Sequence, residues 1–102
     1  MRVISSKKLR EFWQRHPDSR AELTKWFKIV ESAKWQHFAE VRAVFSRADT
    51  VRVGSGNTVT IFDICGTNYR LVVKFHYNRQ IAYILKCMGH EEYSRERWKG
   101  EL

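Results

Sequence analysis

The hydrophobic pattern of the chain changes its period once, near Thr50. Before that residue apolar side chains recur at the three- and four-residue spacing of amphipathic helices, and after it they alternate as in β-strands. Helices followed by strands and a short helical end predict an α+β fold, with N-terminal helices packed on one face of a small antiparallel sheet and a short C-terminal helix. At 102 residues the chain is large enough for one core, so we expect a single domain over residues 1–102.

The helical half predicts two amphipathic helices and a shorter third one. The first ends near His16-Pro17, the second follows at once, and residues 38–46 add another helical turn or two. The apolar stripes of these helices, which we expect to face the core, comprise Leu9, Phe12, Trp13, Leu23, Trp26, Phe27, Val30, Ala33, Val41 and Phe45.

Polar residues at the predicted helix starts supply candidate caps. Ser5 or Ser6 can cap the first helix, and the second helix begins at Asp18 or Ser19. Ser19 and Glu22 match the capping-box pattern S-x-x-E, in which each side chain bonds to the other residue's backbone N–H group.

Four strands are predicted after Thr50, and the breaks between them are short and rich in Gly and Asn, which favours an antiparallel meander. Cys65 and Cys87 show neither a CxxC motif nor a Cys/His ligand spacing. We therefore expect no zinc site and no disulfide, but two strand residues that pack as small hydrophobes. The predicted strands are VRV (51–53), VTIFDI (59–64), NYRLVVKFHY (68–77) and IAYILKCM (81–88).

The net charge of +8, from 19 Lys and Arg against 11 Asp and Glu, is distributed unevenly. From Ile64 through His90 the chain contains four Lys or Arg residues and no acidic residue. Such a window is a candidate polyanion-binding surface, because phosphate contacts need cations without competing carboxylates. Two alternatives stay open at this point: a generally basic protein, or a basic domain that binds an acidic partner protein.

The strand at residues 68–77 has two distinct faces, because successive side chains of a strand point in opposite directions. Arg70, Lys74 and His76 fall on the face away from the expected core. Arg70 and Lys74 are about 13 Å apart, a spacing that can track a nucleic-acid backbone. The alternative is an ordinary solvated sheet face. The opposite face, which we expect under the helices, carries Tyr69, Leu71, Val73, Phe75 and Tyr77.

The stretch GHEEY at residues 89–93 follows the last predicted strand. Because that strand runs back along its neighbour, the hairpin is expected to bring His90 near Arg70. An imidazole, which ordinarily titrates near neutral pH, beside a guanidinium that binds phosphate bidentately suits cleavage of a phosphodiester. Tyr93 shares a helical face with His90 and can stack on a base or exchange a proton. Each residue alone is more often structural, and the combination makes the candidate site.

The start MRVISSKKLREF has only a two-residue apolar run and therefore no signal-peptide core, and no segment approaches the length of a membrane span. We expect no association with a membrane and a cytoplasmic location.

These residues resemble the HigB branch of the RelE-type toxins of bacterial toxin–antitoxin systems. The specific parts are the block from Gly56 to Val72, which contains YRLV, and the H-x-E-Y end at His90 to Tyr93. The chain departs from the family pattern at Gly89, where Thr is usual, and at Ser94, where Asp is usual. These departures bear on the local helix cap and on the orientation of a neighbouring side chain. Weaker similarity lies in SKKLREFWQRHPD, AKWQHFAEVRAVF and the YI pair at 83 and 84.

The resemblance implies a RelE-like fold and a metal-independent ribonuclease that needs no cofactor and cuts messenger RNA, usually in the ribosomal A site. It also implies inhibition by a HigA-type helix-turn-helix antitoxin, through which any contact with DNA is made. In such an enzyme the ribose 2′-hydroxyl attacks the adjacent phosphorus and leaves a cyclic phosphate and a free 5′-hydroxyl.

On this reading Arg70 and Lys74 contact the phosphate, His90 is the general acid or base, and Tyr93 stacks on a base or transfers a second proton. Two other classes stay open: an inhibitor that poisons DNA gyrase by binding, and a basic RNA-binding module without catalysis. The remaining expected site residues are the RNA contacts His76, Arg79 and Lys86, and the carboxylates Glu91 or Glu92, one of which would orient His90.

Overall fold

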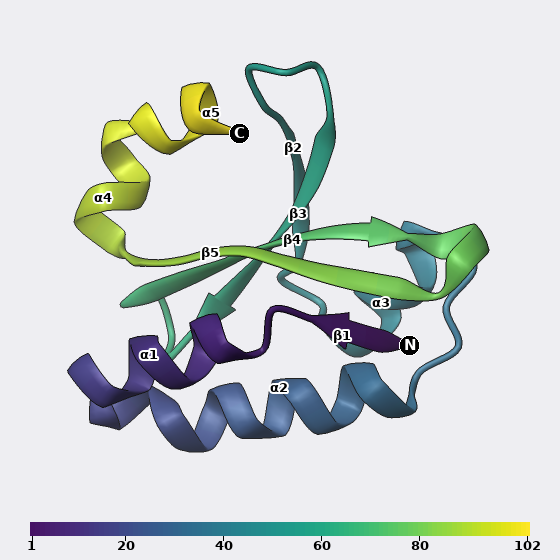
Figure 1. The fold of residues 1–102 in the computed structure, drawn as a ribbon, viewed down its shortest axis with the longest axis horizontal. Coiled ribbons are helices and arrows are strands. Elements are labelled where there is room, and N and C mark those ends of the chain that lie inside the picture. The colour runs from purple at the N-terminus through teal and green to yellow at the C-terminus, as the bar shows by residue number, and fades with distance from the viewer.

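The computed structural model describes residues 1–102, and its helices and its predicted strands follow in the order that the sequence predicts (Figure 1). The elements are β1 (Arg2–Ile4), α1 (Lys7–Arg15), η1 (Pro17–Ser19), α2 (Arg20–Ser32), α3 (Phe38–Val44), β2 (Asp49–Arg52), β3 (Thr58–Ile64), β4 (Tyr69–His76), η2 (Tyr77–Arg79), β5 (Ile81–Gly89), α4 (His90–Arg95) and α5 (Arg97–Glu101). The α+β class is therefore confirmed. No helix combines the length and the apolar composition that a membrane crossing requires.

The sheet has five strands in the order β1-β5-β4-β3-β2. Strands β2 to β5 form the predicted antiparallel meander. The expectation of a wholly antiparallel sheet was wrong at one edge, where β1 pairs with β5 in parallel, so the sheet is mixed. The three residues of β1 are too few to show an alternating pattern, and their pairing depends on a strand almost 80 residues further along the chain.

The helix boundaries follow the sequence more closely than the caps do. Helix α1 ends at Arg15 because His16 precedes a proline and takes up non-helical backbone angles, φ −131° and ψ 74°. The capping box was wrong, since the Ser19 hydroxyl donates to the His16 carbonyl, and Glu22 accepts the backbone N–H of Cys65 at 2.8 Å. The serine cap of α1 was also wrong, because Ser6 makes no side-chain capping bond.

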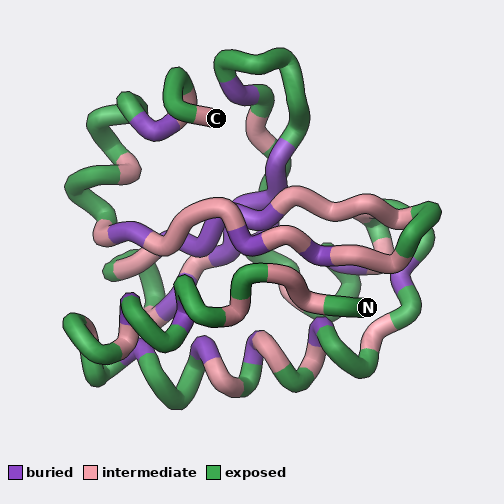
Figure 2. The backbone as a smooth tube through the Cα atoms, viewed as in Figure 1, coloured by how far each residue is buried: buried purple, intermediate pink, exposed green.

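The main core fills the space between the N-terminal helices and one face of the sheet (Figure 2). Leu9 and Phe12 of α1 and Val41 of α3 are buried there as predicted. Burial of each such side chain contributes roughly 1.5–3 kcal/mol to folding. The same core takes the inward face of β4, with Leu71 and Val73 fully buried. The other predicted stripe residues buried in it are Leu23, Trp26 and Val30, with Trp13, Phe27, Ala33 and Phe45 packed at its margin.

A second, smaller core lies on the opposite face of the sheet, beneath α4 and α5 (Figure 1). Its largest member is Trp98 of α5, which is buried in the same cluster as Val72 and Met88. Gly54 allows α5 to approach the β2–β3 hairpin: its N–H donates to the Lys99 carbonyl at 2.8 Å, and a Cβ at this position would lie 3.1 Å from the same oxygen. The predicted helical end is thus two short helices, and one half of the expected solvated face is covered.

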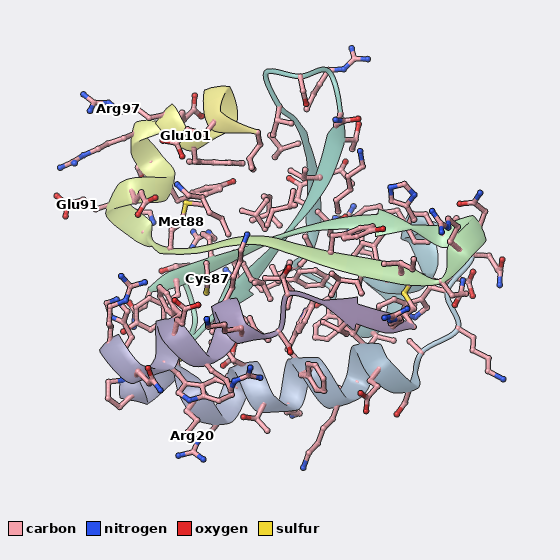
Figure 3. The ribbon with its side chains drawn as sticks, viewed as in Figure 1. Arg20, Cys87, Met88, Glu91, Arg97 and Glu101 are labelled. Atoms are coloured by element: carbon pink, nitrogen blue, oxygen red, sulfur yellow. The ribbon has the colours of Figure 1, made fainter.

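A β-bulge in β5 decides which side chains reach this second core. Val72 pairs with Lys86 and Val73 pairs with Ile84, which leaves Leu85 as an extra residue without a partner on β4. Its carbonyl accepts a hydrogen bond from Lys8 of α1 instead. Even-numbered residues of β5 therefore face the helices before the bulge and the second core after it. After the bulge it is therefore Met88 that faces the second core and Cys87 that faces the main core (Figure 3).

The two cysteines lie in different settings. Cys87 is a strand residue packed against the main core, as predicted, and burial raises the pKa of its thiol to about 12. Cys65 was predicted to be a strand residue, and this was wrong. It lies in the turn between β3 and β4 with a positive φ of 55°, where its N–H reaches the Glu22 carboxylate.

Candidate functional site

Arg70, near the start of β4, is the most highly organised charged side chain of the molecule. The register between β3 and β4 sets it opposite Asp63, and its Nε lies 3.1 Å from Asp63 Oδ1. Its Nη1 donates to the backbone carbonyls of Thr67, at 2.6 Å, and Tyr69, at 3.3 Å. Only 11% of the side chain is exposed. The guanidinium is therefore held on two of its three nitrogens.

The third nitrogen, Nη2, has no protein partner among the hydrogen bonds and ion pairs of Arg70. It is not one of the buried polar atoms without a partner, which are Trp26 Nε1 and Gln80 Oε1, so it reaches the solvent. Arg70 thus presents one pair of N–H groups to an approaching anion. The bidentate binding expected from sequence needs a second nitrogen, and both Nε and Nη1 already have protein partners.

Tyr93 lies against Arg70, a contact that the sequence analysis did not predict. The guanidinium carbon lies 5.0 Å from the centre of the Tyr93 ring, which is within the range of a cation–π contact. The ring also stacks on Trp98, with centroids 5.4 Å apart and planes at 19°. The Trp98 indole N–H donates to the Tyr93 carbonyl at 3.1 Å. Two flat groups already lie against the Tyr93 ring, so a base that stacks there must compete with them.

His90 is the first residue of α4 and lies beside the start of β4. Its backbone N–H donates to the Asn68 carbonyl at 2.9 Å, and Gly89 pairs with Tyr69. The hairpin therefore places the backbone of His90 next to the segment that carries Arg70. Its imidazole Nε2 lies 3.5 Å from the hydroxyl oxygen of Ser94, one turn further along the helix.

The orienting role expected of Glu91 or Glu92 does not occur in the structure. Glu91 lies 3.7 Å from Arg95, one helical turn along, and Glu92 lies 3.0 Å from Lys86. Figure 3 shows Glu91 on the outer side of α4. Neither carboxylate makes an ion pair with His90. Ser94, one of the two residues at which the chain departs from the family pattern, is the side chain that lies next to the His90 imidazole.

Three other expected site residues lie at the far end of β4. Lys74 pairs across the sheet with Tyr83, and His76 packs edge-on against the same ring with centroids 5.3 Å apart. Arg79 follows in η2 at the turn into β5. None of the three makes an ion pair, and Lys74 is about 13 Å from Arg70 along the strand. The structure therefore separates these residues from the Arg70 cluster while keeping Lys74 on the same sheet face.

Lys86 differs from these three because its charge is already matched. Its ammonium lies 2.8 Å from Glu101 of α5 and 3.0 Å from Glu92 of α4. The hydrogen bond to Glu101, followed by that to Glu92, raises the pKa of Lys86. The side chain thus ties both C-terminal helices to β5.

Sequence reasoning missed two residues that contact the site. Asp63 could have been found from alternation, because the pattern VTIFDI sets it on the same strand face as Val59 and Ile61, opposite the helices. Trp98 gave little signal, since it lies in a charged stretch too short to show a helical period.

A model of HigB_toxin, the RelE-like toxic component of a toxin–antitoxin system, matches residues 19–96. This match covers most of the chain and includes Arg70, His90 and Tyr93. The chain belongs to the HigB family of RelE-like toxins. The resemblance predicted from sequence is therefore confirmed, and membership of this HigB family implies an antitoxin as partner. A search of curated proteins finds no match.

Proposed function

We propose that this HigB-family protein is a metal-independent endoribonuclease that cuts messenger RNA on the ribosome and so inhibits translation. The observation that carries the proposal is the state of Arg70: a guanidinium fixed on two nitrogens, with the third left without a protein partner, beside Tyr93 and the first turn of α4. A fixed cation with one free edge suits a phosphate whose charge increases during the reaction, because no reorganisation is needed as that charge develops.

The proposed reaction is a transesterification within the RNA. The ribose 2′-oxygen forms a bond to phosphorus as its proton is removed, and the bond from phosphorus to the 5′-oxygen breaks as that oxygen gains a proton. Arg70 Nη2 donates to a non-bridging oxygen and stabilises its added charge. His90 transfers a proton through its imidazole, and the Tyr93 hydroxyl is the second proton-transfer candidate.

The far end of β4 extends the substrate path. Lys74, His76 and Arg79 carry no carboxylate partner, so they are free to contact phosphates of the RNA on either side of the scissile bond. Lys86 is a weaker candidate for such a contact because Glu92 and Glu101 already neutralise it. The proposed antitoxin is of the HigA type and inhibits by covering the open basic half of this face with an acidic or helical segment.

Substitution of His90 by Gln tests the proposal, because Gln keeps the approximate size and the hydrogen bonding of the imidazole but carries no proton. We expect cleavage of message in a reconstituted translation system to slow by about 10²- to 10⁴-fold, with cyclic-phosphate ends on the product of the parent. His37→Gln is the matched control, since His37 is exposed and contacts only Glu40. Parental thermal melting would show that the fold is retained.

Two outcomes contradict the proposal. If His90→Gln cleaves at the parental rate, the imidazole has no catalytic role. If the parent inhibits growth without cutting message on ribosomes, a binding toxin of the gyrase-inhibitor kind accounts better for the same fold.

A further inference from the structure

We propose that Asp63 is a positioning residue for Arg70: its carboxylate fixes the Nε side of the guanidinium, so that Nη2 alone faces the scissile phosphate. This inference rests on the proposed ribonuclease function, and it assigns a role to a carboxylate for which that reaction has no other use. Asp63 transfers no proton and touches no substrate in this role.

The geometry makes Asp63 part of the framework rather than a chance neighbour. The sheet register pairs Asp63 directly with Arg70, and only 22% of the Asp63 side chain is exposed. Its two oxygens are divided between two arginines: Oδ1 lies 3.1 Å from Arg70 Nε, and Oδ2 lies 3.6 Å from Arg47 Nε. Arg70 is the nearer and more buried of the two partners, and the exposed Arg47 adds only a weaker contact.

An acidic residue at a phosphate site has a cost that needs a compensating gain. Asp63 offsets the positive charge that attracts RNA, so it weakens substrate binding relative to a neutral residue. The gain is orientation. The two carbonyl contacts of Nη1 hold one side of the guanidinium, and the Asp63 contact at Nε fixes its other side. A pre-fixed cation is worth most when charge develops in the transition state.

Binding and turnover should therefore respond in opposite directions when the Asp63 charge is removed. If Asp63 served only stability, removing its charge would lower the melting temperature and the fraction of active enzyme. KM and the Arg70 geometry would stay as in the parent. If Asp63 only reduced the effective positive charge of Arg70, removing the Asp63 charge would raise kcat. If Asp63 is a positioning residue, removing its charge lowers kcat and leaves KM unchanged or lower.

The test compares Asp63→Asn with Arg47→Gln in the full chain. Arg47 is the other partner of the same carboxylate, and 69% of its side chain is exposed. We expect Asp63→Asn to lower kcat for message cleavage by about 10- to 10²-fold, with KM equal to or below the parental value. Arg47→Gln should leave kcat within about two-fold, because Arg70 keeps its carbonyl and Asp63 contacts.

A second readout does not depend on activity. In ¹⁵N-labelled protein the Arg70 Nε–H signal should exchange slowly with solvent, and Asp63→Asn should accelerate that exchange whereas Arg47→Gln should not. If the parent fails to cut RNA, the proposed function fails and this exchange measurement still tests the positioning. Unchanged exchange in Asp63→Asn, or a kcat at or above the parental value, overturns the inference.

Asp63→Glu serves if Asp63→Asn does not fold. It keeps the charge and moves the carboxylate by one methylene group. Positioning predicts that kcat falls although the net charge of the site is unchanged, and a parental kcat for a folded Asp63→Glu would contradict it.

Discussion

Arg70 and Lys74 project from the same face of β4, four residues apart, and the structure treats them in opposite ways. Arg70 lies in the half covered by α4 and α5, with an ion pair, two carbonyl contacts and an aromatic ring against it. Lys74 lies in the open half, where it has no carboxylate partner and faces Tyr83 on the next strand. One cation is fixed and nearly buried, and the other is free to follow a ligand.

The difference shows why a charge pattern in sequence does not describe a charge pattern in space. No acidic residue occurs from Ile64 to His90, but carboxylates on either side of this segment in the sequence pair with its cations in the structure. Asp63 pairs with Arg70 from just before the window, whereas Glu92 and Glu101, from just after it, pair with Lys86. Of the four cations in the window, only Lys74 and Arg79 remain unpaired. Free cations suit RNA binding, and fixed ones suit transition-state stabilisation.

Alanine substitutions of Arg70 and Lys74 should separate these two roles. We expect Arg70→Ala to lower kcat for message cleavage by about 10²- to 10³-fold, because it removes the oriented donor to the transition state. Lys74→Ala should act mainly on KM, by a few-fold, and should reduce the slope of log affinity against log salt by about one ion.

Thermal melting and circular dichroism are needed beside this pair, because Arg70→Ala leaves Asp63 with only Arg47 as a partner. Equal effects of the two substitutions on kcat, in folded proteins, would abolish the distinction between the fixed and the open half of the strand face.

The parts of the fold that depend on local pattern could be predicted from the sequence. The two-face division of β4 was correct because strand geometry alone determines it, and the end of α1 was correct because Pro17 acts on its immediate neighbour. The hairpin between β4 and β5, which places the backbone of His90 beside the start of β4, also depends only on local pattern.

The parts that depend on distant pairing could not be predicted. The bulge at Leu85 leaves no signature in composition, yet it reverses which side chains of β5 face the second core. The pairing of β1, the cover provided by Trp98 and the Asp63 ion pair each join segments far apart in the chain or follow from a register set by a turn. The ion pair between Asp63 and Arg70 depends on such a contact. The site predicted from sequence therefore left Arg70 without a carboxylate partner, whereas the structure pairs it.

Tyr93→Phe sharpens the comparison inside the covered half. The ring would keep its packing against Arg70 and Trp98, so the fold and the Arg70 orientation should be retained. Only the hydroxyl is lost. If that group transfers a proton, kcat should fall by about 10- to 10²-fold with little change in KM. A parental kcat would assign Tyr93 to the support of Arg70 alone, and a raised KM would indicate a direct contact with RNA.

The smallest expected effect concerns the two sides of β5, where Lys86 belongs to the site face and Cys87 to the helix-covered face. Burial raises the pKa of the Cys87 thiol from its ordinary 9.0 to about 12. The folded state therefore holds this proton more tightly than the unfolded state does, so its contribution to stability is complete below about pH 9 and is lost as the pH rises toward 12. The pKa of Lys86 is raised as well, by its hydrogen bonds to Glu101 and Glu92, and this shift acts in the same direction.

We expect the melting temperature to fall from about pH 8 to about pH 11, and to fall less in Cys87→Ala, which has no thiol to ionise. Comparing each protein with itself across pH cancels the cavity that the alanine leaves. An equal fall in both proteins would assign the alkaline sensitivity to the other groups whose pKa is raised, which are Lys86, Cys65, Tyr69 and Tyr77, instead of to Cys87.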